Sequence, residues 1–252
     1  MQYFIITGAS KGLGEAMSIE LLKEGHHLLC VSRHESDRLK KMAAAKNTLL
    51  DFFSFDLSRT GHIPELCEQM FKQIDTRSAS GLYLVNNAGV IEPVGRVEDC
   101  LPEEVDFHMR VNLMAPMLLA AEFIRRSRKM NIEKRILNIS SGAAKNPYYG
   151  WSNYCTAKAG LDMFGQCISA EQQDEPNPVK TMAVAPGIID TDMQTTIRGT
   201  DERAFIHRDK FVELKESGQL TPPASAGKKL AQILLSDRFE DGAIQDIRDS
   251  YS

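Results

Sequence analysis

Short apolar segments alternate with segments of helical periodicity from the first residues almost to the end of the chain. This alternation is typical of a parallel sheet whose strands are connected by helices on both faces. The predicted strands are Tyr3–Thr7, His27–Ser32, Leu50–Phe55, Leu82–Asn86, Arg135–Ser140, Lys180–Ala185 and, with a weaker pattern, Ala243–Ile247. The predicted helices are Leu13–Glu24, Ser36–Ala45, Ile63–Arg77, Glu103–Lys129, Asn153–Glu171 and Ala224–Leu235. We therefore expect a single doubly wound α/β domain over residues 1–252, with about seven strands.

Residues 187–220 interrupt the alternation, because they form a long polar and charged stretch. An amphipathic pattern within it predicts a helix around Glu202–Lys215. Long connections of this kind usually carry function. We expect an excursion over the edge of the sheet that covers a ligand, and the sequence leaves open whether it moves as a lid.

The charge balance favours a small-molecule partner. Thirty Lys and Arg against 34 Asp and Glu give a net charge of -4, so no basic field attracts nucleic acid or anionic lipid. The five cysteines contain no C-x-x-C pair, which argues against a disulfide framework and against a metal site. The opening apolar run is too short for a signal peptide, and no stretch reaches the roughly 18 apolar residues of a membrane span. We expect a protein of the cytoplasm that does not enter the membrane.

A glycine-rich loop, T-G-A-S-K-G-L-G at 7–14, follows the first predicted strand and leads directly into a helix. Glycines here allow a tight turn and a close approach to a pyrophosphate, whose charge the free N–H groups of the helix start stabilise. The spacing G-x-x-x-G-x-G departs from the more common G-x-G-x-x-G pattern. The expected coenzyme contacts are Gly8, Ser10, Lys11, Gly12, Leu13 and Gly14. A turn that binds no ligand is the alternative.

The second predicted strand has no carboxylate at its tip and is followed by Arg33. In dinucleotide folds an acidic residue near this point binds the ribose 2′-OH of NAD, whereas an arginine accommodates the 2′-phosphate of NADP. Arg33, together with Lys11 in the glycine loop, therefore favours NADP(H) over NAD(H). The alternative is a surface arginine that pairs with Glu35 or Asp37.

Two polar motifs follow the third and fourth predicted strands, D-L at 56–57 and N-N-A-G at 86–89. Ligands of open α/β sheets bind at the carboxyl ends of strands. The candidate coenzyme contacts in these motifs are Asp56, Leu57, Asn87, Ala88 and Gly89. The alternatives are that Asp56 or Ser58 only caps the next helix and that the second motif is only a turn.

Tyr154 and Lys158 lie four residues apart on a predicted helix and therefore share one of its faces. The ammonium group can then lie near the phenol and stabilise its ionised form, which would lower the pKa of Tyr154 from about 10 toward neutrality. Ser141 ends the preceding strand, and the loop between can fold it over the helix. A serine hydroxyl beside the phenol completes a group that can give a proton to a carbonyl oxygen.

The chain resembles the short-chain dehydrogenase/reductase family in seven motifs that occur in the family's order. They are T-G-A-S-K-G-L-G at 7–14, D-L at 56–57, N-N-A-G at 86–89, V-N at 111–112, I-S-S at 139–141, Y-C-T-A-K at 154–158 and P-G-I-I-D-T-D-M at 186–193. The resemblance covers nearly the whole chain and implies a Rossmann-type fold. It implies a catalytic tetrad of Asn112, Ser141, Tyr154 and Lys158, in which Asn112 holds a water beside Lys158 and Lys158 also binds the nicotinamide ribose. The further coenzyme contacts that it implies are Val111, Pro186, Gly187, Ile189, Thr191 and Met193.

The same resemblance implies a homodimer or homotetramer built on the two long helices. Within the family, the C-terminal half is similar to the sepiapterin reductases and the related bacterial benzil reductases, in L-N-I-S-S at 137–141, D-T-D-M-Q at 190–194 and G-A-I-Q-D at 242–246. In sepiapterin reductases the last aspartate anchors the pterin, and Asp246 occupies the matching place. The residues around it differ from the pattern expected of a pterin enzyme, so a role in substrate binding is left open beside that of a surface carboxylate.

The loop between Ser141 and Tyr154 contains Trp151, the only tryptophan, and also Tyr148 and Tyr149. Such a concentration of aromatic rings suits a flat or aromatic substrate. The alternative is that the rings pack under the loop or across a subunit contact. The candidate substrate contacts are Ser141, Ala143, Tyr148, Trp151, Tyr154 and Gly187.

We therefore expect an NADPH-dependent reductase of a ketone or 1,2-diketone, such as an enzyme that converts benzil to benzoin. A reductase of a pterin side chain or of a 3-oxoacyl thioester is the nearest alternative. A protein that senses NADP(H) without turnover is a third possibility, and it has no need for Ser141, Tyr154 and Lys158 together.

Overall fold

The computed structural model describes residues 1–248. At its centre is one seven-stranded sheet in the order β3-β2-β1-β4-β5-β6-β7, in which neighbouring strands are parallel. The strands are β1 (Gln2–Thr7), β2 (His26–Ser32), β3 (Leu49–Ser54), β4 (Gly81–Asn86), β5 (Glu133–Ile139), β6 (Lys180–Ala185) and β7 (Ala243–Asp246). The sheet confirms the predicted Rossmann-type architecture. Its strand order reverses between β1 and β4, where such sheets bind ligands.

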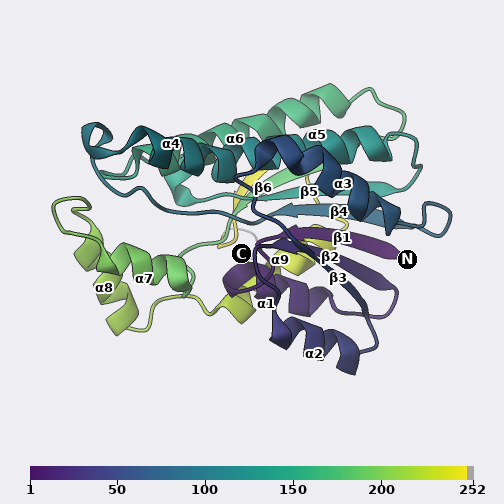
Figure 1. Ribbon diagram of the computed structural model, residues 1–252, viewed down its shortest axis with the longest axis horizontal. Helices are drawn as coiled ribbons and strands as arrows, with labels where there is room; N and C mark the ends of the chain where they lie inside the picture. The colour runs from purple at the N-terminus through teal and green to yellow at the C-terminus, as the bar shows by residue number, and fades with distance from the viewer. Residues whose placement is uncertain (249–252) are drawn as a thin grey trace.

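Helices cover both faces of the sheet (Figure 1). One face carries α1 (Gly12–Leu21), α2 (Asp37–Ala45) and α9 (Pro223–Leu235). The other carries α3 (Ile63–Lys72), α4 (Pro102–Met109), α5 (Ala115–Ser127) and α6 (Ser152–Gln172). Within residues 1–248, none of the helices combines the length and the apolar character that crossing a bilayer requires.

Each face of the sheet has its own hydrophobic core. Phe4 and Ile6 of β1 belong to the core under α1 and α9, whereas Tyr3 and Ile5 belong to the core under α3 and α5. Successive residues of a strand point to opposite faces. A strand that is covered on both faces must therefore be apolar at every position, which explains the continuous apolar runs of the sequence.

The long helix predicted over Glu103–Lys129 is divided in the structure, so this prediction is wrong. α4 ends at Met109, one π-helical turn spans Arg110–Met114, and α5 begins at Ala115. Pro116 has no N–H with which to bond the carbonyl of Asn112, four residues earlier. The N–H of Ala115 bonds to the carbonyl of Arg110, five residues earlier, as in a π-turn. Such turns are frequent at functional sites, and this one carries Asn112.

The excursion after β6 lies beyond the carboxyl ends of the strands (Figure 1). It contains α7 (Asp192–Gly199) and α8 (Arg208–Glu216). The helix predicted around Glu202–Lys215 corresponds to α8 but begins later, and α7 was not predicted. Phe205, between the two helices, is fully buried. The excursion is therefore packed against the rest of the protein rather than extended into solvent.

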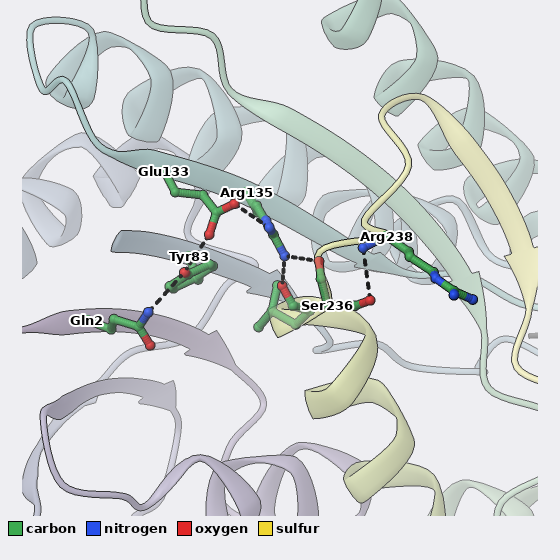
Figure 2. Close-up of polar contacts among 7 residues, drawn as sticks. Gln2, Tyr83, Glu133, Arg135, Ser236 and Arg238 are labelled. Atoms are coloured by element: carbon green, nitrogen blue, oxygen red, sulfur yellow. Dashed lines mark hydrogen bonds and ion pairs between the residues drawn. The ribbon is translucent and has the colours of Figure 1, made fainter. Parts of the chain in front are cut away.

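A buried arginine ties the end of α9 to β4 and β5 (Figure 2). Arg135 is only 3% exposed, and its guanidinium donates to the carbonyls of Leu234 (2.6 Å) and Ser236 (2.8 Å). It also pairs with Glu133, which accepts a hydrogen bond from the Tyr83 hydroxyl at 3.0 Å. A cation at a helix C-terminus satisfies free carbonyls and opposes the negative end of the helix dipole.

We expect Arg135→Met to lower the free energy of unfolding by about 3 kcal/mol, because it removes the donor to two carbonyls and the partner of Glu133. Chemical denaturation followed by circular dichroism measures this change. Arg238→Met is the control, since the side chain of Arg238 is exposed. This substitution should change the free energy of unfolding by less than about 0.5 kcal/mol. Equally small changes in the two variants would contradict the proposed role of Arg135.

Candidate active site

The carboxyl ends of β1 and β4 form a crevice with a glycine-rich wall. Gly8 (φ +68°) and Gly12 (φ +58°) adopt a left-handed conformation that other residues rarely take. A Cβ on Gly14 would lie 2.2 Å from the carbonyl oxygen of Gly8 and 2.4 Å from Nδ2 of Asn87. Lys11, the N-cap of α1, makes no side-chain cap hydrogen bond in the described structure. The first backbone N–H groups of α1 are thus left for an anion, and the wall fits a pyrophosphate.

Thr7 and Asn87 hold the glycine loop against the loop that follows β4. The Thr7 hydroxyl accepts the N–H groups of Asn87 (3.0 Å) and Ala88 (3.1 Å). The side-chain amide of Asn87 donates to the carbonyl of Thr7 at 2.9 Å. A Cβ on Gly8 would lie 3.0 Å from Cα of Ala88. The predicted coenzyme residues of both loops therefore share one edge of the crevice.

Arg33 is exposed directly after β2. Glu35 pairs with Lys40, and within residues 1–248 no ion pair joins Arg33 to Glu35 or to Asp37. The surface ion pair considered as the alternative role of Arg33 is therefore absent from the described residues. The guanidinium of Arg33 is accessible to a phosphate at this edge of the sheet.

Asp56 and Leu57 follow β3 at the same edge. The Asp56 carboxylate accepts the N–H of Ser58 at 2.9 Å, which is the capping contact considered as its alternative role. Leu57 is buried against the core under α3. Contact of either residue with a coenzyme stays a prediction.

Residues 186–193 run from the end of β6 past the glycine loop. Lys11 forms an ion pair with Asp192 (2.7 Å), and a Cβ on Gly12 would lie 3.2 Å from Cγ2 of Thr191. Pro186 and Ile189 are buried, Gly187 has φ +79°, and Met193 is half-buried. The segment predicted to lie beside the nicotinamide therefore adjoins the loop predicted to hold the phosphates, and it engages Lys11.

Ser141, Tyr154 and Lys158 meet at the carboxyl end of β5. α6 presents Tyr154 and Lys158 on one face, and Ser141 lies close enough to the Tyr154 phenol to lower its pKa. The ammonium nitrogen of Lys158 lies 5.7 Å from the centre of the Tyr154 ring. It donates to the carbonyl of Ile139 at 2.7 Å, which fixes it at the end of the strand. The structure thus brings the three residues together as predicted.

Burial controls the ionisation of both groups. Tyr154 is 8% exposed, and burial raises its pKa to about 12, while Ser141 acts in the opposite direction. The expectation that Lys158 lowers the phenol pKa toward neutrality is therefore wrong for this structure. Burial also lowers the pKa of Lys158 to about 8, against the charge of Asp162. The pair keeps a proton on the phenol at neutral pH, as a proton donor requires.

Asn112 reaches the same region from the π-turn. Its Oδ1 accepts the N–H of Val90 (2.8 Å), and its Nδ2 donates to the carbonyl of Val90 (2.7 Å). Asn112 Oδ1 and Lys158 Nζ lie 3.0 and 3.9 Å from the point where a Cβ on Gly89 would be. Asn112 is therefore close to Lys158 across this glycine, with Val111 buried beside it.

The aromatic loop before α6 is covered by the excursion. Trp151 stacks on Phe205 with ring centres 4.5 Å apart and an angle of 8°, and it meets Tyr154 edge-on at 5.7 Å. Tyr148 lies 5.1 Å from Trp151, and Ala143 is buried in the same cluster. The packing considered as the alternative for Trp151 is thus present, and Phe205 of the excursion covers the tryptophan that meets Tyr154.

Asp246 ends β7 at this edge of the sheet. Its carboxylate pairs with Arg248 at 2.6 Å, and this contact lowers its pKa. The ion pair fits the surface role considered for Asp246, and contact with a substrate remains a prediction.

Three residues near the site were not predicted. His108 is completely buried beside Asn112, and Phe205 covers Trp151. Asp162 is buried near Lys158. Only Asp162 had a signal in the sequence, because it lies four residues after Lys158 on the same helix face. His108 and Phe205 are brought to the site by tertiary packing.

The model of the family described as short chain dehydrogenase matches residues 2–202. The benzil reductase ((S)-benzoin forming) of Bacillus subtilis (strain 168) is 40% identical over 250 residues, covering 99% of both chains. The sepiapterin reductase of Meriones unguiculatus is 31% identical over 258 residues, covering 98% of this chain and 96% of its own. The crystal structure of the KRED1-Pglu enzyme superposes with a TM-score of 0.82 at 28% identity, over 97% of this chain and 100% of that one. The chain therefore belongs to the short-chain dehydrogenase family, as the seven motifs predicted.

Proposed function

We propose that the protein is an NADPH-dependent carbonyl reductase of the cytoplasm that reduces a ketone or a 1,2-diketone, with benzil as the type substrate. The observation that carries this proposal is the cluster of Ser141, Tyr154 and Lys158 beside the glycine-walled crevice. The 40% identity to a benzil reductase over 99% of both chains supports this substrate class. Five free thiols are consistent with a reducing compartment.

The residues of the cluster have complementary tasks in this proposal. When bound, a reduced nicotinamide coenzyme supplies the hydride. Tyr154 donates its phenolic proton to the carbonyl oxygen, and Ser141 holds the phenol and orients the carbonyl. Lys158 stabilises the charge that the phenol acquires as the proton leaves. The buried setting strengthens this electrostatic interaction.

The aromatic cluster supports a substrate with a ring and a second polar group. Trp151 is 5% exposed, and its indole N–H has no hydrogen-bond partner within the described part of the chain. A buried donor without a partner is unfavourable by about 1–3 kcal/mol. A 1,2-diketone could place one carbonyl at Tyr154 and the other at this indole, with an aromatic ring in the place of Phe205 after the excursion opens. Tyr148 and Ala143 would complete the wall.

The proposed activity is tested by the absorbance of NADPH at 340 nm, with benzil, sepiapterin, an aryl monoketone and acetoacetyl thioester as separate substrates. We expect benzil to give the highest kcat/KM. A preference for sepiapterin or the thioester would move the protein to another reductase class. Tight NADPH binding without oxidation by any of the four compounds would overturn the proposal and favour a coenzyme sensor.

Arg33→Ser is expected to raise KM for NADPH by about tenfold or more and to leave KM for NADH nearly unchanged, because only NADPH carries the phosphate that a guanidinium binds in charge-assisted contacts. Initial rates with both coenzymes measure the two KM values. Arg38→Ser is a matched control, since Arg38 is exposed nearby but pairs with Glu15 at 3.3 Å. Equal changes for the two coenzymes would contradict the assignment of Arg33.

We also propose that the protein forms a homodimer through its long helices. Large apolar side chains are exposed on and between α4, α5 and α6, where they form a surface of the kind that mediates association. They are Phe107, Met114, Met117, Leu118 and Met163. This surface is proposed as the contact between two copies of the chain.

The double variant Met117→Glu, Met163→Glu is expected to be a monomer, because it places two charges in the proposed apolar contact. Sedimentation velocity over a range of concentrations should show the dimer dissociation constant rising by about 100-fold or more. Leu49→Glu is the control, since Leu49 is 51% exposed on β3, away from these helices. A double variant that sediments as the wild type does would contradict this interface.

A further inference from the structure

His108 is the one histidine that the structure places against the proposed catalytic residues. It lies near the end of α4 and has no exposed surface. Its Nδ1 lies 2.7 Å from the carbonyl oxygen of Glu92, and its Nε2 lies 2.8 Å from Nδ2 of Asn112. The ring meets the Tyr154 ring edge-on, with centres 6.2 Å apart. One imidazole therefore joins the loop after β4, the π-turn and α6.

The neighbours of His108 determine which nitrogen carries the proton. The carbonyl of Glu92 can only accept, so Nδ1 must donate to it. Val90 fixes the orientation of the Asn112 amide, because Oδ1 accepts its N–H and Nδ2 donates to its carbonyl. If the amide were reversed, its Nδ2 would face the N–H of Val90 and its Oδ1 would face the carbonyl oxygen of Val90. Nδ2 of Asn112 lies 2.8 Å from Nε2 and also 3.3 Å from Nδ1, so the amide lies over the face of the imidazole rather than in line with the lone pair of either ring nitrogen.

Burial keeps the ring neutral. It lowers the pKa of His108, and the charge of Lys158 acts in the same direction, while hydrogen bonds to the backbone of Glu92 and Asn153 oppose it. The neutral ring that donates to the Glu92 carbonyl carries its hydrogen on Nδ1.

We propose that His108 is a positioning residue for the reaction, an inference that rests on the proposed function. By donating to Glu92 and covering the Asn112 amide with its ring, it holds the Asn112 side chain and the Val90–Glu92 backbone in one arrangement. That backbone follows Gly89, across which Asn112 and Lys158 approach each other. The Tyr154 ring is in a T-shaped arrangement with the same imidazole. His108 thereby holds Asn112, Lys158 and Tyr154 in register for proton transfer.

Two substitutions separate the hydrogen bond to Glu92 from the ring. His108→Gln retains a donor for Glu92 and loses the ring, whereas His108→Phe retains an aromatic ring beside Asn112 and loses the donor. Since small displacements at a reacting centre can lower rates by up to about 100-fold, we expect His108→Phe to lower kcat about 10-fold to 100-fold. KM for NADPH should stay within about twofold, because the glycine loop is untouched. His108→Gln should keep kcat within about threefold of wild type.

The pH profile of kcat provides a readout that a purely structural role would not move. We expect the apparent pKa of this profile to shift in His108→Phe and to return to the wild-type value in His108→Gln. His27→Phe is the matched control: His27 is also buried, but it lies near the amino end of β2 and pairs with Asp51 of β3 at 2.7 Å. Its kcat per folded enzyme and its profile should equal those of wild type. Unchanged kcat and pH profile in His108→Phe, or equal losses in both His108 variants, would overturn the inference.

A measurement on the unmodified protein covers the case in which His108→Phe does not fold. Nitrogen-15 spectra of the imidazole distinguish the two neutral tautomers, and we expect hydrogen on Nδ1 with Nε2 free. Hydrogen on Nε2 would overturn the inference. A wild-type enzyme that reduces no carbonyl compound would instead overturn the proposed function, and the positioning role with it. An active wild type with unaffected variants would overturn the positioning role alone.

Discussion

Tyr154→Phe is expected to lower kcat for NADPH-dependent reduction of benzil by about 100-fold or more, because general acid catalysis by a positioned group typically contributes 10²–10⁴-fold. The substitution removes only the phenolic oxygen, so the ring keeps its contacts with Trp151 and His108. Since burial raises the pKa of Tyr154 to about 12, the wild-type phenol holds its proton throughout the neutral range. The acid limb of the pH profile of kcat should therefore show no ionisation of Tyr154.

Coenzyme binding is the control for Tyr154→Phe. NADPH fluorescence should give a dissociation constant within about threefold of wild type, because the glycine loop and Arg33 carry most of the proposed contacts. Tyr149→Phe is a matched variant, since Tyr149 lies in the same loop region but is 40% exposed, and it should retain full activity. Activity of Tyr154→Phe within about tenfold of wild type would remove the proposed acid.

The sheet was predictable because its five inner strands are buried on both faces. Phe4 and Ile6 face one core, and Tyr3 and Ile5 face the other, so the run is apolar at every position and stands out from the amphipathic helices. α7 was missed for the opposite reason. Its sequence D-M-Q-T-T-I-R-G is polar, with one buried apolar residue, Ile197. It is held by its contacts with α8 and the glycine loop rather than by its own pattern.

The members of the site were predictable, but their electrostatics were not. The spacing of Tyr154 and Lys158 placed them on one helix face, and the structure confirms this placement. Spacing cannot show that Phe205, from a segment far along the chain, stacks on Trp151, or that Trp151 meets the Tyr154 ring in one buried cluster. That burial reverses the expected direction of the pKa shift of Tyr154. The π-turn at Asn112 was in principle visible, because Pro116 cannot continue an α-helix.

Lys158→Met is expected to change activity and stability in opposite directions. It should lower kcat by about 100-fold or more, because the phenol loses the cation that stabilises its charge during proton transfer. It should also raise the free energy of unfolding. Burial lowers the pKa of Lys158 from 10.5 to about 8, and each unit of such a shift corresponds to about 1.4 kcal/mol. Removal of the buried cation should therefore raise the free energy of unfolding by about 3 kcal/mol at pH 7. Loss of the hydrogen bond to Ile139 should lower it again by about 1 kcal/mol.

The pH dependence of stability identifies the cause of this gain. Between pH 8 and 10.5 the unfolded chain binds more protons at this lysine than the folded chain does, so the wild-type free energy of unfolding rises with pH through that window. Below pH 8 the full penalty of the buried cation is present. The advantage of Lys158→Met should accordingly be greatest at and below neutral pH and should disappear by about pH 10. Urea denaturation without coenzyme, at several pH values, measures it.

Lys134→Met separates the catalytic effect from the burial of a lysine as such. Lys134 is 1% exposed, and its ammonium donates to the carbonyls of Ser127 (3.1 Å) and Asn177 (2.8 Å). Burial lowers its pKa as well, but it lies at the amino end of β5, opposite to Tyr154. We expect normal kcat in Lys134→Met. Two results would contradict the view that the fold retains Lys158 as a buried cation, at a cost in stability, for the sake of catalysis. One is a lower free energy of unfolding in Lys158→Met than in wild type at pH 7. The other is a free energy of unfolding in Lys158→Met that varies with pH as that of wild type does.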